Sequence, residues 1–376
     1  MGGAEWSLLD LARSFPGRCT VLLFEDGPFR RHLEAAGVDV GVCPAPAGLL
    51  GVRRDVGRLG ALQSLPGALA YTHRLAQWAR PYDVLYANSQ KAFVLGALVA
   101  ALRRKPLLWH LRNVLSEEGF SASSRALVVR LANRFAARVI ANSEATAAAF
   151  VARGGRAEKV RVVYNGIDPE PFLRVTEEAA RALRRTLGLD GAPVVGCLSR
   201  LAPIKGQHVL LEALAALPGV HAIVVGEALF GDEATYGDAL RRQAQTLGIA
   251  ERVHFLGFRT DTPTLLRACD VVVMPSVVPE SFGRVIVEGM LAERPVVATR
   301  LGAAVELIED GVTGRLVPSE DAEALAGALG ALLAEPEAAR RMAQAGRRSA
   351  LERFSLARML DGVARQIDAV VAAHRR

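Results

Sequence analysis

The chain has 376 residues, of which 51% are apolar and 23% are charged, and its formal net charge is +7. This length is enough for two domains with a core each, and this balance excludes an extensively disordered chain. The longest apolar run covers residues 92–102 and is too short to span a bilayer. The four cysteines are scattered without a CxxC or CxH pairing. We therefore expect buried free thiols in a reducing cytoplasm rather than disulfides or metal ligands.

The positive charge is concentrated in the first half of the chain. Residues 1–168 carry a net charge of +9, and the remaining residues carry −2. Basic clusters lie at Arg30-Arg31, Arg53-Arg54 and Arg103-Arg104-Lys105. Two interpretations stay open, a solvated surface and a surface that meets anionic lipid or a polyanionic acceptor. A nucleic-acid partner is not expected, because no aromatic residues are interleaved with the basic ones and no binding motif is present.

Short apolar runs alternate with helix-length segments in the first half. A glycine-rich turn, Gly2-Gly3-Ala4-Glu5, leads into an amphipathic segment at residues 6–15. Strands are then expected at residues 20–24, 38–43, 83–88, 107–111, 138–142 and 160–164. A doubly wound domain opens with a strand that leads into such a turn, and this first strand is missing before Gly2. We expect a start site placed too late or a truncated chain, with an unpaired edge on the strand beside the missing one.

The second half repeats the alternation. Strands are expected at residues 194–198, 222–225, 253–256, 271–274 and 296–299, and helices at 207–217, 322–333 and 336–353. Two successive arrays of this kind predict an α/β protein with two doubly wound parallel sheets. We expect an N-terminal domain at 1–168, a polar linker at 169–192, and a second domain at 193–355. A C-terminal helix at 356–376 is expected to cross back to the N-terminal domain.

Two cations follow the first strand of the second half. Arg200 and Lys205 lie on the loop from Ser199 to Gln207, which joins this strand to a helix. Ligands of open α/β sheets bind at the carboxyl edge of the sheet, where such loops lie. The guanidinium fork of Arg200 and the point charge of Lys205 suit a diphosphate leaving group. A solvated loop is the alternative interpretation of this segment taken alone.

Two carboxylates flank the start of a predicted helix. Glu280 precedes the turn Ser281-Phe282-Gly283, and Glu288 follows it by about two helical turns. A helix start offers unpaired N–H groups and the positive end of a dipole, which suit a phosphate or a sugar hydroxyl. A carboxylate at Glu288 can accept two hydrogen bonds from a ribose diol. The alternatives are a carboxylate favoured by the helix dipole at Glu280 and a solvated helix residue at Glu288.

The motifs of the chain occur in one order. They are Ser199-Arg200-Leu201 followed by Gly206, Val225-Gly226, Phe255-Leu256-Gly257-Phe258, Glu280-x7-Glu288 and Gly311-x2-Gly314, preceded in the first half by Gly2–Glu5, Trp109–Arg112, Ala141–Glu144 and Val163–Asp168. With them the chain resembles the retaining GT-B glycosyltransferases of family 4 over nearly its whole length. The resemblance implies two Rossmann-like domains that face each other across a cleft, and a nucleotide-sugar donor.

The resemblance also implies roles for single residues. Glu288 would bind the ribose hydroxyls of the donor. Glu280 would hold hydroxyls of the donor sugar, helped by the backbone amides of Phe282 and Gly283. His110 would lie close to the transferred sugar. Because His110 follows an apolar strand, a buried core histidine is the alternative interpretation.

The remaining contacts of the donor follow from the same resemblance. Arg200 and Lys205 would take the diphosphate, with Gly2 or Gly3 approaching it from the other domain. The backbone near Phe258 and Arg259 would meet the base. Contacts made through backbone leave no side-chain signature, so UDP-, GDP- and ADP-sugars all remain open as donors.

The expected reaction is the transfer of a sugar to an acceptor hydroxyl with retention of anomeric configuration. The sequence has no Asp-x-Asp triplet, so no metal and no cofactor are expected, and the cations and helix amides would stabilise the diphosphate. The acceptor would be a glycan, a glycolipid or a small molecule of cell-envelope synthesis, reached by a cytoplasmic protein at the membrane face. A GT-B sugar-nucleotide epimerase and a catalytically impaired nucleotide-sugar-binding protein are the alternatives.

Overall fold

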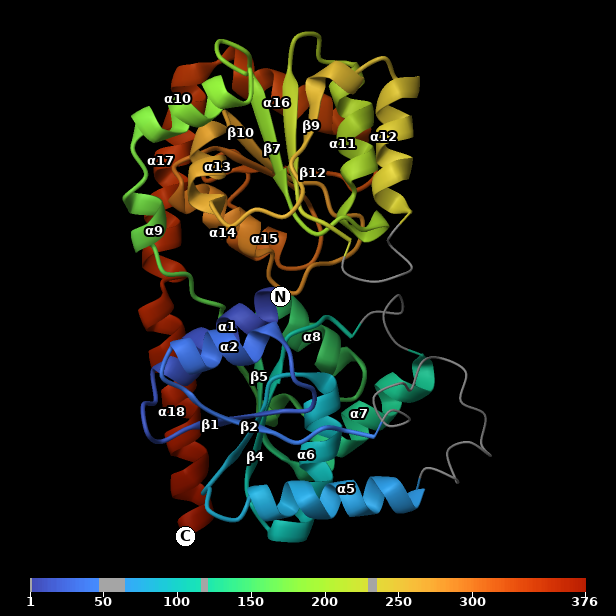
Figure 1. The fold of residues 1–376 in the computed structure, drawn as a ribbon, viewed down its shortest axis with the longest axis vertical. Helices are drawn as coiled ribbons and strands as arrows, with labels where there is room; N and C mark the ends of the chain where they lie inside the picture. The colour runs from blue at the N-terminus through green and yellow to red at the C-terminus, as the bar shows by residue number, and fades with distance from the viewer. Residues whose placement is uncertain (1, 47–64, 116–120, 229–234) are drawn as a thin grey trace. The chain divides into compact units, whose positions relative to one another are not determined.

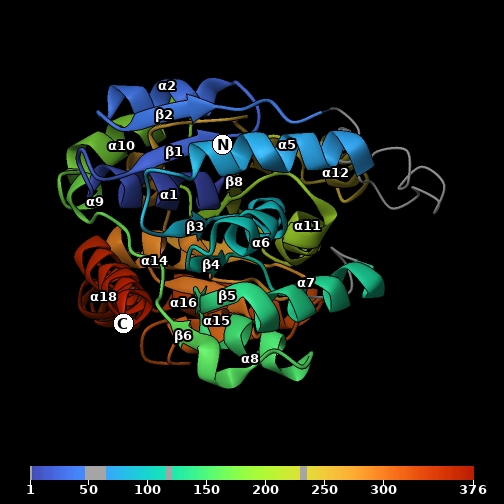
Figure 2. The same cartoon turned by 90° about the horizontal axis from the view of Figure 1, so that it is seen from below.

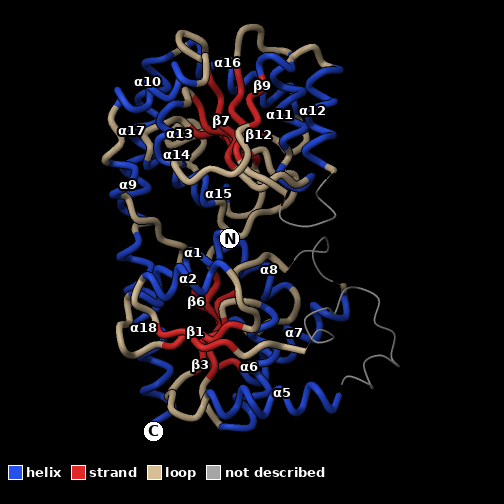
Figure 3. Tube along the Cα trace, in the orientation of Figure 1, coloured by secondary structure: helices blue, strands red, loops and turns tan. Residues whose placement is uncertain are grey.

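The computed structural model describes residues 2–46, 65–115, 121–228 and 235–376 (Figure 1). The chain folds into two compact units. Unit 1 comprises Met1–Gly166 and Ala357–Arg376, and unit 2 comprises Ile167–Leu356. In each unit, parallel strands form the centre and helices flank them (Figure 3). Arg53 and Arg54, predicted to form a basic cluster, lie outside the described residues. In the described ranges, every helix is too short or too polar to cross a membrane.

Unit 1 begins with a helix that already includes Gly3, Ala4 and Glu5 of the predicted glycine-rich turn, with Gly2 as its N-cap. Its elements in chain order are α1 (Gly3–Arg13), β1 (Thr20–Leu23), α2 (Pro28–Ala35), β2 (Asp39–Val42), α5 (Leu65–Trp78), β3 (Leu85–Ala87), α6 (Gln90–Arg103), β4 (Leu107–Leu111), α7 (Ala122–Phe135), β5 (Ala136–Ala141), α8 (Glu144–Ala152), the 3-10 turn η1 (Ala157–Lys159), β6 (Val160–Val162) and α18 (Leu356–Arg375). Helix α5 packs against α6, which in turn packs against α7 (Figure 2).

The parallel strands of unit 1 form two separate sheets. Strand β1 pairs with β2, and the order of the other sheet is β3-β4-β5-β6. Within the described residues no backbone pairing joins β1 to β3, and α1 is the first element. In the described residues, β1 and β2 thus form a sheet separate from the one that contains β3 to β6.

The core of unit 1 is built around β4. Trp109 is 1% exposed, and its ring stacks on Phe93 with centroids 4.3 Å apart. The ring of Phe150 meets Trp109 edge-on at 6.1 Å. Helix α18 also lies against this unit, because a Cβ on Gly362 would be 2.9 Å from Val163 Cγ1. The residues Leu356–Arg375 thus form a helix that packs on the N-terminal part of the chain.

Unit 2 contains one parallel sheet of six strands in the order β12-β11-β10-β7-β8-β9. Its elements are α9 (Glu170–Leu173), α10 (Glu177–Thr186), β7 (Val194–Leu198), the 3-10 turn η2 (Pro203–Lys205), α11 (Gln207–Ala215), β8 (His221–Val225), α12 (Tyr236–Thr246), the 3-10 turn η4 (Ala250–Arg252), β9 (Val253–Phe255), α13 (Thr262–Ala268), β10 (Val271–Met274), α14 (Arg284–Leu291), β11 (Val296–Thr299), α15 (Ala304–Leu307), β12 (Arg315–Val317), α16 (Ala322–Ala334) and α17 (Pro336–Arg353).

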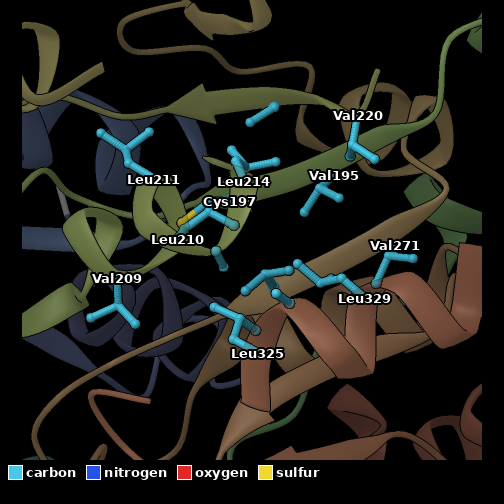
Figure 4. Close-up of a cluster of buried hydrophobic side chains, with 14 of the residues drawn as sticks. Val195, Cys197, Val209, Leu210, Leu211, Leu214, Val220, Val271, Leu325 and Leu329 are labelled. Atoms are coloured by element: carbon cyan, nitrogen blue, oxygen red, sulfur yellow. The ribbon is translucent and has the colours of Figure 1, made fainter. Parts of the chain in front are cut away.

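One hydrophobic cluster joins this sheet to the helices on one of its faces. Val195 and Cys197 of β7 share this cluster with buried leucines of α11, such as Leu210, and of α16, such as Leu329 (Figure 4). Burial raises the pKa of the Cys197 thiol to about 12, as expected for an inert thiol in an apolar core. Residues 169–192, predicted to be a linker, form α9 and α10 in unit 2.

Candidate functional site

The loops at the carboxyl edge of the unit 2 sheet are joined by backbone hydrogen bonds. The Gly226 amide after β8 donates to the Gly257 carbonyl after β9 at 2.9 Å, and the Leu201 amide after β7 donates to the Glu227 carbonyl at 3.1 Å. A Cβ on Gly226 would lie 2.0 Å from the Ser199 carbonyl oxygen. Glycine at this position therefore lets three loops approach one another at the edge where ligands of such sheets bind.

A second close approach fixes the loop that carries the two cations. Gly206 has a φ of +70°, and a Cβ at this residue would lie 1.8 Å from the Pro275 carbonyl oxygen. The Val277 amide donates to the Ile204 carbonyl at 3.0 Å. The loop after β7 is thus held directly against the segment that follows β10.

This packing brings Lys205 and Glu280 together. The Lys205 ammonium forms an ion pair with Glu280 Oε1, and the Ser276 hydroxyl donates to the same oxygen at 2.7 Å. Ser276 is 1% exposed, and its carbonyl accepts a hydrogen bond from the Thr299 hydroxyl at 2.6 Å. Strand β11 therefore fixes Ser276, and Ser276 and Lys205 fix the Glu280 carboxylate.

Glu288 is held by a different neighbour. Arg284, the first residue of α14, reaches Glu288 Oε1 with Nε and Nη2, each at 3.2 Å. Both side chains are largely buried, with 24% of Arg284 and 16% of Glu288 exposed. The helical spacing of four residues places the two groups on one face of the helix. Glu288 is thus neither a cap nor a solvated helix residue.

The turn before α14 has a buried anchor. The Phe282 side chain is 2% exposed, and its ring meets Phe354 edge-on with centroids 5.9 Å apart. Gly283 has a φ of +81°, which favours glycine. The side chain of Phe282 is therefore part of the core of unit 2.

The other predicted donor residues of unit 2 lie on the joined loops. The Arg200 side chain is half-buried, and the Arg200 carbonyl accepts from Gln207 Nε2 at 2.9 Å. Phe258 is 60% exposed, and its amide donates to Glu227 Oε1 at 3.3 Å. Arg259 forms a fork with Asp261 at 2.8 and 2.6 Å. The Arg259 side chain is therefore engaged within its own loop.

In unit 1, His110 lies near the carboxyl end of β4 and is fully buried. Its Nδ1 hydrogen-bonds the Tyr86 hydroxyl, while its Nε2 has no partner in the described part of the chain. Burial and the nearby Arg112 charge hold the pKa of His110 well below its usual value. The imidazole is therefore neutral at pH 7 and leaves one buried ring nitrogen unsatisfied.

The start of α1 is tied to the same edge of unit 1. The Gly2 amide donates to Glu5 Oε2 at 2.6 Å, and Asn88 Nδ2 donates to the Ala4 carbonyl at 3.1 Å. Asn88 Oδ1 in turn accepts from Arg112 Nε at 2.9 Å. Gly2 and Gly3 are thus connected to residues that follow β3 and β4.

Three residues of the site were not predicted from the sequence. Ser276, Arg284 and Tyr86 each contact a predicted site residue. The spacing of four between Arg284 and Glu288 could have indicated their ion pair. Ser276 and Tyr86 contact their partners only because of the order of the strands in each sheet, which the sequence alone does not show. In the described ranges, no three His, Cys, Asp or Glu side chains gather as a metal site would require.

Both units match known families of proteins. Residues 2–166 match the family described as glycosyl transferase 4-like domain, and residues 180–349 match glycosyl transferases group 1. A D-inositol 3-phosphate glycosyltransferase from Corynebacterium urealyticum is 33% identical over 73% of this chain and 70% of its own length. Another from Mycolicibacterium gilvum is 34% identical, and the match spans 59% of that protein.

Solved structures agree with these matches. The structure of Anabaena Alr3699/HepE in complex with UDP-glucose has a TM-score of 0.89 and 40% identity, covering 98% of this chain and 96% of that one. Sucrose-phosphate synthase from Thermosynechococcus elongatus is 22% identical with a TM-score of 0.75, which shows the shared fold. The fold is the two-unit α/β architecture of the GT-B glycosyltransferases. The chain belongs to the glycosyltransferase family whose two parts are the 4-like domain and the group 1 domain.

Proposed function

We propose that the protein transfers a sugar from a nucleotide-diphosphate sugar to an acceptor hydroxyl with retention of configuration. The observation that carries this proposal is the pair of oriented carboxylates at the carboxyl edge of unit 2. Glu280 is held by Lys205 and Ser276, and Glu288 is held by Arg284. The UDP and UDP-glucose complexes of Anabaena Alr3699/HepE support the same donor class and favour UDP-glucose as the first donor to test.

The contacts suggest how each carboxylate would be used. Among the described residues, all side-chain contacts of Glu280 and Glu288 go to Oε1. A carboxylate oxygen accepts hydrogen bonds at more than one position, so Oε2 of each group is available to hydroxyls. We assign Glu288 to the ribose and Glu280 to the donor sugar. The backbone amides of Phe282 and Gly283 would support the sugar contact.

The reacting charge would be stabilised by cations rather than by a protein base. When the bond between the anomeric carbon and the diphosphate oxygen breaks, Arg200 and Lys205 stabilise the departing diphosphate. The acceptor oxygen bonds to the anomeric carbon on the face that the diphosphate leaves, and the acceptor proton passes to a diphosphate oxygen. Because this proton has a destination on the donor itself, no separate enzymic base is required.

The roles of the remaining residues complete the proposal. The backbone at Phe258 and Arg259 would meet the base, and Gly2 or Gly3 would approach the diphosphate. The unsatisfied Nε2 of His110 would donate to a hydroxyl of the transferred sugar. The acceptor would belong to cell-envelope, polysaccharide or glycolipid synthesis at the cytoplasmic membrane face.

A thermal-shift panel of UDP, GDP, ADP and their glucose conjugates tests the donor. A ligand at 100 times its Kd stabilises the folded state by about 2.7 kcal/mol, so a true donor raises the Tm clearly. We expect UDP and UDP-glucose to raise it, and GDP and ADP to have no effect at the same concentration. If none of the nucleotides raises the Tm, the proposed donor class is wrong.

Two further measurements test the assigned residues and the stereochemistry. Glu288→Ala should lower kcat/KM for the donor roughly a hundredfold, because contacts worth about 3 kcal/mol to the ribose are lost. An unchanged value in the folded variant would refute the assignment.

Slow hydrolysis of UDP-glucose without acceptor should release α-glucose first. Release of the β anomer would exclude retention, and an epimerised nucleotide sugar would identify an epimerase instead.

A further inference from the structure

A cationic hollow lies in unit 1 at the edge of the sheet opposite His110. It has a volume of about 330 Å³ and is lined by Arg130, Asn133, Arg134, Arg156 and Lys159. Lys159 directly precedes β6, and Phe135 directly precedes β5, so the hollow lies at the amino ends of these parallel strands. His110 is near the carboxyl end of β4. The hollow and His110 therefore lie at opposite edges of the unit 1 sheet.

The floor of the hollow is held by hydrogen bonds. Lys159 Nζ donates to the Asn133 and Ala136 carbonyls at 2.8 and 2.7 Å and so closes the C-terminus of α7. Asn133 Oδ1 accepts from the Arg156 amide at 2.9 Å, and Asn133 Nδ2 donates to the Gly154 carbonyl at 2.8 Å. These contacts fix the backbone that carries Arg156 against the end of α7. The positions of the cations are thus set by the fold.

The arginines of the hollow have no acidic partner among the described residues. Arg130 and Arg134 lie one turn apart on α7, a helix without any acidic residue, and both are exposed, as is Arg156. In the same part of the chain none of these three forms an ion pair with a carboxylate. The pKa of Lys159 is lowered, mainly because the side chain is partly buried and also because Arg156 and Arg134 lie nearby. The charge of Glu158 opposes this effect. A bound anion would reduce the electrostatic repulsion among the arginines and the lysine of the hollow.

A second hollow continues the cationic surface. It has a volume of about 580 Å³ and shares Arg134 with the first. Its remaining basic residues are Arg104, Lys105 and Arg138, and neither hollow is lined by an aspartate or glutamate of the described chain. Ala100, Ala101 and Val370 are among its apolar lining residues. Of the basic clusters in the sequence, Arg104 and Lys105 join this surface, whereas Arg30 is paired with Asp26 and Glu34.

We propose that Arg130, Arg134, Arg156 and Lys159 form a binding site for a phosphate group, outside the sugar-transfer site. Arginine suits phosphate because its planar fork donates two parallel hydrogen bonds to two phosphate oxygens. Three arginines and a fixed lysine supply more positive charge than a phosphate monoester or diester needs for its neutralisation. The ligand is either a free phosphate anion or the phosphate headgroup of an anionic phospholipid. The first reaches the site from solution, whereas the second requires the site to approach a membrane surface.

The test compares two double variants of equal charge change. Arg130→Gln with Arg134→Gln alters the site, and Arg341→Gln with Arg348→Gln alters two exposed arginines of α17 in unit 2. All proteins are saturated with UDP so that phosphate does not act at the assigned diphosphate residues. One arm titrates inorganic phosphate by calorimetry. The other sediments protein with vesicles of phosphatidylcholine, with and without phosphatidylglycerol, at low and high salt.

We expect the site variant to weaken binding more than about tenfold in one arm, with the control variant unchanged. A loss in the calorimetric arm identifies a free phosphate, and a loss in the vesicle arm alone identifies a headgroup. Arg134→Lys keeps the charge and removes the fork, so it should retain only part of the affinity. UDP-glucose hydrolysis should stay at the level of the unmodified protein in each variant. Equal binding by both double variants, or binding of neither probe by the unmodified protein, overturns the proposal.

Discussion

Glu280 and Glu288 are each held through one oxygen by neighbours from their own unit. Ser276 and Lys205 contact Glu280 Oε1, and Arg284 contacts Glu288 Oε1. A group fixed before its ligand arrives loses less rotational freedom when the ligand binds. The neighbours of the two carboxylates should therefore affect donor use even without touching the donor.

Ser276→Ala tests this relation at Glu280. Loss of a hydrogen bond to a charged group costs about 1.5–3 kcal/mol, so kcat/KM for UDP-glucose should fall roughly tenfold to a hundredfold. The affinity for UDP should not change, because Glu280 is assigned to the sugar and not to the nucleotide. The comparison of UDP and UDP-glucose by calorimetry checks this. An equal loss for both ligands would indicate a collapsed site, and no loss for either would show that Ser276 is not needed.

Tyr86 and His110 form a second pair of this kind. Burial raises the pKa of Tyr86 and lowers that of His110, so both side chains are neutral near pH 7. A neutral phenol that donates to Nδ1 leaves the imidazole proton on Nε2, the nitrogen without a partner among the described residues. The pair thus favours the tautomer that can donate to a sugar hydroxyl.

Tyr86→Phe should release this constraint with little change in ring packing. We expect the ¹⁵N chemical shifts of the His110 ring to move from the Nε2–H tautomer toward a mixture. We also expect kcat for sugar transfer to fall about tenfold with the affinity for UDP unchanged. Unchanged ring shifts in the variant would mean that Tyr86 does not select the tautomer.

At the scale of elements, most strands could be predicted because they are short, apolar and rich in valine. The bounds of β4, β7, β10 and β11 are as predicted, whereas β12, the strand Arg315–Val317, was missed. It has three residues and begins with an exposed arginine, so it lacks the apolar run that identifies the others. It forms because it pairs with β11, and such an edge pairing leaves little trace in the sequence.

The sequence motifs predict single residues of the candidate site better than they predict the contacts between these residues. The motifs predict Glu280, Glu288, Arg200 and Lys205 as donor-binding residues, and the structure shows an ion pair between Lys205 and Glu280. The contact of Ser276 with Glu280 and the contact of Thr299 with Ser276 depend on β10 and β11 being neighbours in the sheet. Sequence periodicity defines which residues are buried, but strand order decides which of them meet.

Gly206→Ala tests whether the loop after β7 must approach Pro275 as closely as it does. The matched control is Gly219→Ala, because Gly219 has a similar φ of +75° and no atom within 4 Å of its would-be Cβ. The control should lose only about 1–2 kcal/mol, the cost of a left-handed residue. Gly206→Ala should lose more than this, because its Cβ would overlap the Pro275 carbonyl at 1.8 Å. Urea unfolding measures both changes, and equal losses would show that the contact is unimportant.

The whole molecule contains neutral histidines in both units. His110 is buried in unit 1, and His221 and His254 stack in unit 2 with ring centroids 5.4 Å apart and Nδ1 of the first 3.1 Å from Nε2 of the second. Burial lowers the pKa of all three, aided by Arg112 at His110, Arg252 at His221 and His221 at His254. Protonation of these residues is therefore coupled to unfolding in each unit.

This coupling predicts that stability falls on mild acidification. A histidine whose folded pKa is lowered binds a proton more readily in the unfolded chain, so the unfolded state gains as pH falls below about 6.5. Each such histidine contributes a slope of up to about 1.4 kcal/mol per pH unit until its folded pKa is reached. The lowered pKa values of Asp261 and Asp310 act in a separate window, below the usual range of a carboxyl group. Urea unfolding between about pH 5 and pH 7 therefore isolates the histidines.

His254→Gln identifies the contribution of unit 2 to this slope. The amide of glutamine can still hydrogen-bond His221 but does not titrate, so the variant loses the lowered pKa of His254 as a source of acid sensitivity. We expect the variant to lose less stability than the unmodified protein when the pH is lowered from about 7 to 5. The two proteins should show parallel curves above about pH 7, where both histidines are neutral in the folded and unfolded states. A slope as steep in the variant as in the unmodified protein would place the acid sensitivity in other groups, with His110 in unit 1 as the first to examine.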